Sequence, residues 1–129
     1  MQYGTTSDYS TSYVKIAVDA WKDANASAAT EARLLEYDEM ITNLGYENNF
    51  YCTGDCYYKG SMDNVPTWVY NSNYFYWMMT PNNDSTSNVW TVNLDGNLNS
   101  MNVTNYRTPG TGESLVVRPV ITLSKSVLQ

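Results

Sequence analysis

The 129-residue sequence predicts a single α+β domain, with two helices first and a group of strands after them. Three observations support this prediction. Apolar residues in the first third of the chain recur every three or four positions, which is the period of an amphipathic helix. Later segments alternate apolar and polar residues, which is the period of a strand. Between two of these segments, Asp95-Gly96 is a strong signal for a tight two-residue hairpin turn.

The first helix is expected within residues 8–27. Its apolar face is marked by four residues at helical spacing: Val14, Ala17, Val18 and Trp21. Ser10 or Ser12 suits the N-cap, because a serine hydroxyl accepts a hydrogen bond from a free N–H of the first turn. We therefore expect Trp21 in the hydrophobic core, and we interpret residues 1–8 as a polar lead-in.

The second helix is expected from about residue 37 to residue 44, after a short extended segment at 33–35. Its inward side is expected to hold four apolar residues: Leu35, Met40, Ile41 and Leu44. Asp38 and Glu39 suit the first turn, where acidic side chains face the positive end of the helix dipole. Gly45 suits the position just after the last turn.

The second half of the chain is expected to form the sheet. Residues 46–70 have the composition of a loop, rich in Asn, Gly and Asp. Strands are expected at 74–80, in a hairpin over 89–103, and at 115–124, since bulky and aromatic residues suit a pleated surface. Pro119 lacks an N–H and therefore predicts an edge position or a bulge in the last strand.

Alternation assigns faces within these strands. Four residues of the hairpin are expected to share the inward face: Trp90, Val92, Leu94 and Leu98. Met101 and Val103 have the opposite parity, which predicts a β-bulge at Asn99 or Ser100. Tyr76 and Trp77 are neighbours in a strand, so one of them is expected inside and the other outside.

Composition narrows the possible partners. The net charge is −6 and the seven Lys and Arg residues are scattered, so neither nucleic acid nor an anionic membrane surface is favoured. No run approaches the roughly 18 apolar residues of a membrane span, so we expect no direct membrane insertion. Twelve tyrosines with many Asn and Ser residues resemble the composition of antibody paratopes. A β-rich extracellular domain with many tyrosines is the alternative.

Two cysteines, Cys52 and Cys56, flank a Thr-Gly-Asp turn. A zinc site needs four ligands, and the chain has no histidine and no further cysteine. A tight turn can bring the two Cα atoms within the separation that a disulfide requires. The spacing therefore favours a local disulfide and an oxidising compartment.

Several segments resemble bacterial C-type lectin-like domains, which occur at the C-termini of surface and pilin-like proteins. The resembling strands read YWMMTP, VWTVNLDGNL and VRPVITLSKS, in this order. The segment ARLLEYDEM is similar to the Arg-Leu-x-x-x-x-Glu element of the formylglycine-generating-enzyme branch of that fold. Variable proteins of diversity-generating retroelements share the fold. Two departures are Val117, where glycine is frequent, and a longer loop at 107–115.

The resemblance implies a C-type lectin-like fold, with two N-terminal helices packed on a small twisted antiparallel sheet and long late loops. It implies one domain over residues 1–129, which can be the C-terminal part of a longer protein on a bacterial surface or a phage particle. It also implies that Arg33 and Arg118 are structural, and we expect both to donate hydrogen bonds to backbone carbonyls. The structural alternative is a pilus or surface-protein domain without a dedicated ligand.

In this fold the late loops form the ligand surface, and retroelement diversification leaves Asn, Tyr, Ser and Thr there. We therefore expect a surface that binds a protein or a glycan. It is made of mainly exposed residues that converge on one face with Tyr74 or Tyr76: Asn82, Asn83, Ser85, Ser87, Asn88, Asn99, Asn102, Asn105 and Tyr106. Aromatic side chains usually dominate such interfaces, which favours Tyr106 and one outward tyrosine as anchors.

An enzyme is a weaker interpretation, because the chain lacks histidine, the usual general base. The two cysteines are too close together in sequence, and too far upstream, to resemble the cysteine pair of formylglycine-generating enzymes. Asp84, Asp95 and Glu113 can supply oxygen ligands for calcium, but they match no calcium-loop motif. We therefore expect no catalytic residue, no metal and no cofactor.

We predict a disulfide between Cys52 and Cys56 in the mature protein. Intact mass measured before and after reduction tests this directly, because reducing one disulfide adds two hydrogen atoms. A mass that does not change on reduction contradicts the pairing.

Overall fold

A computed structural model describes residues 1–48, 50–53, 55–58, 60–82, 86–108, 112 and 114–128, without the side chains of residues 50–53, 55–57 and 128. The helices are α1 (Tyr13–Asn25) and α2 (Tyr37–Asn43), with single 3-10 turns at Tyr9–Thr11, Thr67–Val69 and Lys125–Leu128. The strands are β1 (Glu31–Arg33), β2 (Phe50–Thr53), β3 (Asp55–Tyr58), β4 (Phe75–Pro81), β5 (Asn88–Val92), β6 (Leu98–Asn102), β7 (Leu115–Val116) and β8 (Val120–Thr122). The architecture is α+β, as predicted. No described helix is long and apolar enough to span a bilayer.

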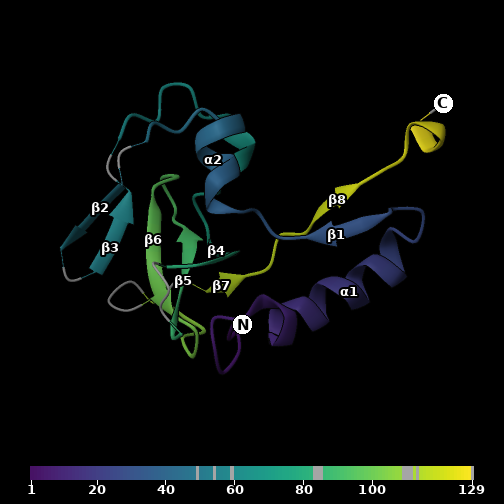
Figure 1. Cartoon of the computed structure of the whole chain (residues 1–129), viewed down its shortest axis with the longest axis horizontal. Helices are drawn as coiled ribbons and strands as arrows, with labels where there is room; N and C mark the ends of the chain where they lie inside the picture. The colour runs from purple at the N-terminus through teal and green to yellow at the C-terminus, as the bar shows by residue number, and fades with distance from the viewer. Residues whose placement is uncertain are drawn as a thin grey trace.

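The strands form two sheets. Six of them pair in the order β2-β3-β6-β5-β4-β7, and β1 pairs with β8 in a separate antiparallel ribbon. The expectation of one antiparallel sheet is wrong in two respects: the strands form two sheets, and β7 runs parallel to β4. Figure 1 shows the ribbon and α1 extending to one side of the larger sheet, α2 above its central strands, and β2 and β3 at its opposite end.

Helix α1 begins where the sequence predicts. The Ser12 hydroxyl accepts a hydrogen bond from the N–H of Lys15 at 3.0 Å, which caps the first turn. Val14 and Val18 are fully buried, but Trp21 is 39% exposed and is not a core residue. The apolar face of α1 is wider than the part of the helix that packs against the rest of the protein. Trp21 lies at the edge of this buried part.

Helix α2 is fixed by a network around Glu39. The Glu39 carboxylate accepts two hydrogen bonds from the Arg33 guanidinium, at 2.6 and 3.0 Å, and one from the N–H of Glu36 at 2.7 Å. Burial alone raises the pKa of Glu39, but the hydrogen bonds from Arg33 and from the Glu36 N–H, together with the Arg33 charge, outweigh burial, so that pKa is lowered. Arg33 also donates to the Leu34 carbonyl, which confirms its predicted bracing role. Gly45 follows the helix with a φ of 83°, as a helix terminator requires.

The region predicted as a loop contains a hairpin. Strands β2 and β3 pair antiparallel, and the backbone register places Cys52 directly opposite Cys56. Residues directly opposite in an antiparallel pair have Cα atoms about 4.5–5.5 Å apart, which falls within the range that a disulfide spans. The cysteine side chains lie outside the described residues, so the disulfide stays a prediction.

The central strands are buried on both faces. One face packs on an α2 cluster, whose buried members include Met40, Tyr76, Trp90, Val92 and Leu98. The other packs on an α1 cluster, whose buried members include Val14, Val18, Phe75, Trp77 and Val89. Tyr76 and Trp77 are 1% and 0% exposed, so the prediction that one of them faces solvent is wrong. Alternate side chains along these strands therefore point into two different cores, rather than into one core and into water.

The β5–β6 hairpin turns at Asp95-Gly96, but its loop has three residues rather than two. The N–H of Asn93 donates to the Asn97 carbonyl at 2.9 Å, and Gly96 has a φ of 91°. A type I turn followed by a left-handed glycine gives this geometry. Leu94 is therefore a turn residue, and it packs on the α1 cluster rather than beside Trp90.

The predicted bulge in the return strand is absent. Strand β6 pairs with β5 in unbroken register from Asn88–Asn102 to Val92–Leu98. Val103 belongs to the α1 cluster, so its opposite parity reflects the second core. The irregularity lies in β4, where the register with β5 shifts between Trp77 and Pro81.

The predicted last strand is split at Val117–Pro119 into β7 and β8, which belong to different sheets. Arg118 stabilises this crossing. Its guanidinium donates to the carbonyls of Trp68 at 2.8 Å and Val69 at 3.3 Å, and it lies over the Tyr76 ring, 4.8 Å from its centre. The predicted bracing by Arg118 is confirmed.

The first residues are part of the core rather than a polar lead-in. Tyr3 is fully buried in the α1 cluster, with its ring 5.2 Å from that of Trp77. The N–H of Tyr3 donates to the Val103 carbonyl at 2.9 Å, and the Trp77 indole donates to the Met1 carbonyl at 2.8 Å. These contacts hold the N-terminal segment against the chain that follows β6.

Trp90→Ala should lower the free energy of unfolding by about 3–5 kcal/mol, because it removes a large buried side chain. Trp90 is 3% exposed and packs against the Tyr37 ring of α2, with the ring centres 4.7 Å apart. Denaturant unfolding of the variant measures the change. Trp68→Ala is the matched control, since Trp68 is 54% exposed, and it should change stability by less than about 1 kcal/mol. Equal losses in the two variants would contradict the placement of Trp90.

Candidate functional site

Five of the predicted site residues lie close together where β4 and β6 end and β5 begins. Asn88 pairs directly with Asn102 across β5 and β6. The N–H of Asn82 donates to the Asn88 carbonyl at 3.1 Å, and the N–H of Val103 donates to the Ser87 carbonyl at 2.9 Å. We call the solvent-facing part of this region the strand-end surface. It consists of Ser87, Asn88, Asn102, Asn105 and Tyr106.

A hydrogen-bonded turn fixes the chain that carries Tyr106. The Asn102 side-chain oxygen accepts from the N–H and the hydroxyl of Thr104, at 2.9 and 2.7 Å. The N–H of Asn105 donates to the Asn102 carbonyl at 3.0 Å, and the N–H of Leu115 donates to the Tyr106 carbonyl at 3.1 Å. The Tyr106 backbone is therefore held at a fixed place, while its side chain is 63% exposed.

Two of the predicted site residues are buried, so their predicted exposure is wrong. Tyr76 is 1% exposed, and its hydroxyl donates to the Val69 carbonyl. Burial raises the pKa of Tyr76, although the nearby Arg118 charge opposes that rise. Asn82 is 6% exposed, and its amide donates to the Ser100 hydroxyl at 2.9 Å. Both are structural side chains of the sheet.

The remaining predicted residues do not join the strand-end surface. Tyr74 is half-buried just before β4 begins, while Asn82 follows its end, and the seven residues of this strand span about 23 Å. Asn99 lies towards the turn end of β6, where its side-chain oxygen accepts from the Asn93 amide at 3.2 Å. Asn83 and Ser85 lie outside the described residues. The prediction of one face is therefore right for only part of the set.

Most of the buried tyrosines hold the structure together. The Tyr46 hydroxyl donates to the Gly96 carbonyl, and burial raises the pKa of Tyr46. The Tyr58 hydroxyl accepts from the N–H of Glu47 at 2.8 Å. Among the tyrosines whose side chains the structure describes, only Tyr13 and Tyr106 are exposed, at 42% and 63%. The high tyrosine content therefore reflects the core more than a paratope-like surface.

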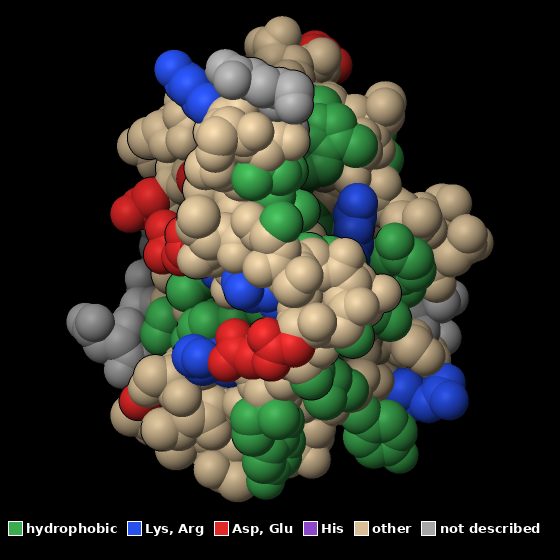
Figure 2. All heavy atoms as spheres, turned by 90° about the vertical axis from the view of Figure 1, so that its right-hand side faces the viewer, with side chains coloured by type: hydrophobic (Ala, Val, Ile, Leu, Met, Phe, Trp, Pro, Cys, Tyr) green, Lys and Arg blue, Asp and Glu red, His purple; other side chains and the backbone are tan. Residues whose placement is uncertain are grey.

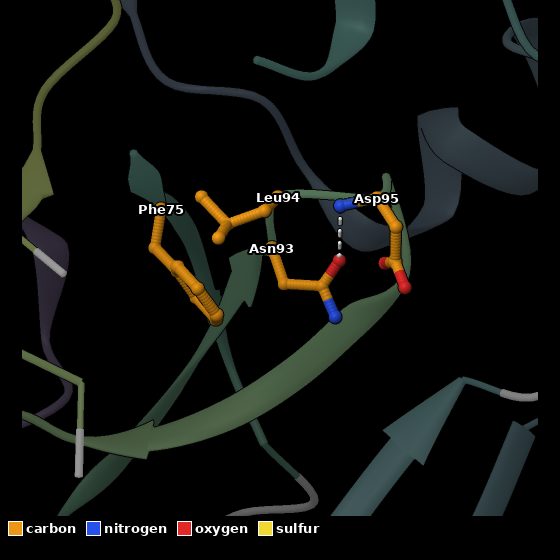
Figure 3. A pocket seen from close by; sticks show the side chains of 4 residues that line it. All are labelled: Phe75, Asn93, Leu94 and Asp95. Atoms are coloured by element: carbon orange, nitrogen blue, oxygen red, sulfur yellow. Dashed lines mark hydrogen bonds between the residues drawn. The ribbon is translucent and has the colours of Figure 1, made fainter. Parts of the chain in front are cut away.

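A pocket lies beside the β5–β6 turn. We call it the turn pocket. It has a volume of about 260 Å³ and is lined by Phe75, Asn93, Leu94 and Asp95. In Figure 3, Phe75 and Leu94 lie on one side of the Asn93 side chain and Asp95 lies on the other. The pocket therefore combines an apolar wall with a carboxylate at its rim.

The turn that forms this pocket is held from several directions. The Asn93 side-chain oxygen accepts from the N–H of Asp95 at 3.0 Å, as the dashed line in Figure 3 marks. One oxygen of the Asp95 carboxylate accepts from the N–H and the amide of Asn97, at 3.1 and 3.0 Å. A Cβ at Gly96 would come within 2.6 Å of Met62 and 2.9 Å of Tyr70, so only glycine fits there. These contacts fix Asp95 in place.

Sequence reasoning identified the turn but not the pocket. The Asp-Gly pair and its flanking asparagines signal the turn directly. Phe75 is 18 positions away from Asn93, and no pattern links the two. Tyr46, which braces the turn from the end of α2, also has no sequence signal for that role.

The described residues contain no group of three or more His, Cys, Asp or Glu side chains that can hold a metal ion. Of the carboxylates considered for calcium, Asp84 and Glu113 lie outside the part of the chain that the structure describes. Asp95 is engaged in its turn through one oxygen.

The sequence places the chain in a domain family. Residues 10–125 match the family described as a domain of unknown function, DUF6273, so the chain belongs to this family. Comparisons with curated proteins and with solved structures give no significant match.

Proposed function

We propose that this domain binds a protein or glycan ligand through the strand-end surface, with Tyr106 as its anchor. The observation that supports this most strongly is the exposure of Tyr106, at 63% the highest of any tyrosine whose side chain is described. Exposed aromatic side chains that can bury a large area are the usual anchors of binding interfaces. Its neighbours carry amide and hydroxyl groups, which form adaptable hydrogen bonds.

Rigidity of the surrounding backbone favours recognition. The residues of the strand-end surface are tied to β5, β6 and the Asn102–Asn105 turn by backbone hydrogen bonds. A surface that is already ordered loses less conformational entropy on binding. The Tyr106 side chain can therefore be exchanged for others without disturbing the two cores, and a diversified binding surface needs this property.

The proposed architecture is a C-type lectin-like domain, and it rests on the resemblance of three strand segments and of ARLLEYDEM. Arg33 and Glu39 occupy the Arg and Glu positions of the resembling element, and in this chain they form an ion pair. On this proposal the domain acts outside the cell, on a bacterial surface or a phage particle, and its late residues are subject to retroelement diversification.

Binding rather than catalysis fits the side chains available. The chain has no histidine, the side chain whose ordinary pKa lies closest to neutral pH. Burial raises the pKa of Tyr76 and Tyr46 away from neutrality. We therefore propose that the domain has no enzymatic activity of its own.

A structural role in a larger surface protein is the second candidate, and the outer side of α1 favours it. Ile16 is 67% exposed, and Tyr13 and Trp21 are 42% and 39% exposed on the same helix. Figure 2 faces the side of the molecule where α1, β1 and β8 lie, and hydrophobic side chains reach the surface there among charged ones. Such a face suits packing against another part of an assembly.

Tyr106→Ala should weaken ligand binding at least about tenfold, because aromatic anchors carry most interface energy. The wild-type domain is first screened against arrays of glycans and of bacterial surface proteins, and each positive is titrated with the variant. The melting temperature should change little, since Tyr106 is exposed.

Tyr13→Ala is the matched control, as it removes an exposed tyrosine from α1, and it should leave binding unchanged. If the positives bind Tyr106→Ala as tightly as the wild type, the strand-end surface is not the site. If only Tyr13→Ala weakens them, the outer side of α1 is the binding surface instead.

A further inference from the structure

The turn pocket lies at the opposite end of β5 and β6 from the strand-end surface, so an inference drawn from it is independent of the proposed function. At about 260 Å³ it is smaller than the roughly 300–1,000 Å³ of typical small-molecule sites. A single amino-acid side chain is therefore a better fit than a whole metabolite.

The chemistry of the pocket is amphipathic. Leu94 is half-buried, and Phe75 is 8% exposed, so the two give an apolar wall with little free ring face. Such a wall suits an aliphatic chain better than a stacked ring. Asp95 is exposed at the rim and places its carboxylate on a fixed turn.

The Asp95 carboxylate keeps one oxygen available. Its Oδ1 atom accepts both hydrogen bonds from Asn97, and its Oδ2 atom has no partner within the described residues. Among the described residues, one ion pair joins Lys15 to Asp19 and another joins Arg33 to Glu39, and neither includes Asp95. The net charge of −6 adds a general attraction for cations.

We propose that the turn pocket binds a lysine side chain presented by a partner protein. The methylene stem lies along Phe75 and Leu94 and crosses Asn93, and the ammonium group donates to the free oxygen of Asp95. Lysine suits such a site because its stem packs on apolar surface while its charged head stays near water. An arginine would bring a wider planar group that gains most from bidentate pairing, and only one oxygen is free here.

The Asp95→Asn variant separates charge from structure. The asparagine side-chain oxygen can still accept both hydrogen bonds from Asn97, so the turn keeps its bonding and loses only its charge. Asp23→Asn is the matched control, because it makes the same charge change at an exposed residue of α1.

The probe is N-acetyl-lysine methylamide, titrated into the isotopically labelled domain and followed by amide chemical shifts. Its uncharged counterpart is N-acetyl-norleucine methylamide, which has an aliphatic side chain of similar length. The lysine probe should shift the amides of Phe75, Leu94 and Asp95 in a saturable way and bind more tightly than the norleucine probe.

Asp95→Asn should weaken binding of the lysine probe about threefold to fivefold, which is the loss expected from removing a partly exposed ion pair. Raised salt should weaken binding to the wild type by a similar factor. Asp23→Asn should bind like the wild type. The proposal is overturned if the norleucine probe binds as well as the lysine probe, if Asp95→Asn binds it unchanged, or if the shifts map elsewhere. Because Tyr106 takes no part, Tyr106→Ala should not alter this titration.

Discussion

The constraint on which this structure depends is that the central strands are buried on both faces. Strand β5 illustrates it, because Trp90 and Val92 enter the α2 cluster while Val89 enters the α1 cluster. Neither core is large, and each is completed by side chains from the sheet. The N-terminal segment contributes to this arrangement, since Tyr3 completes the α1 cluster and ties it to the chain after β6. If that face of the sheet were exposed to water, Tyr3 would have no core to pack against.

Two-sided burial also decides where polar side chains can go. A polar side chain that is buried within a strand is hydrogen-bonded: Thr91 is fully buried, and its hydroxyl donates to the Asn99 carbonyl at 3.1 Å. The other polar residues collect at the two ends of β5 and β6, in the strand-end surface and at the turn pocket. The many asparagines of this region therefore have two roles. Asn93 and Asn102 build turns at opposite ends of these strands, and Asn88 and Asn105 are presented on the strand-end surface beside the Asn102 turn.

Much of this could be predicted from local sequence, and the failures share one cause. Caps, helix ends and the Asp-Gly turn depend on neighbouring residues, and Ser12 and Gly45 lie where the sequence predicts. Burial depends on partners that are distant in sequence. Tyr76 and Trp21 were each assigned from the pattern of one element, which cannot show whether a second layer covers it. The predicted site fails for Asn82 for the same reason, since its amide bonds to Ser100 on a strand two positions away in the sheet.

The most direct test of two-sided burial compares Val89→Ala with Val92→Ala in one strand. The two residues have opposite parity, and both are fully buried. Each variant should lose about 1.5 kcal/mol or more of unfolding free energy in denaturant titrations, because each deletes two methyl-sized groups from a packed core. A sheet with one face in water would lose stability in only one of them. If either variant stays within about 0.5 kcal/mol of the wild type, as surface substitutions usually do, the two-core account is contradicted.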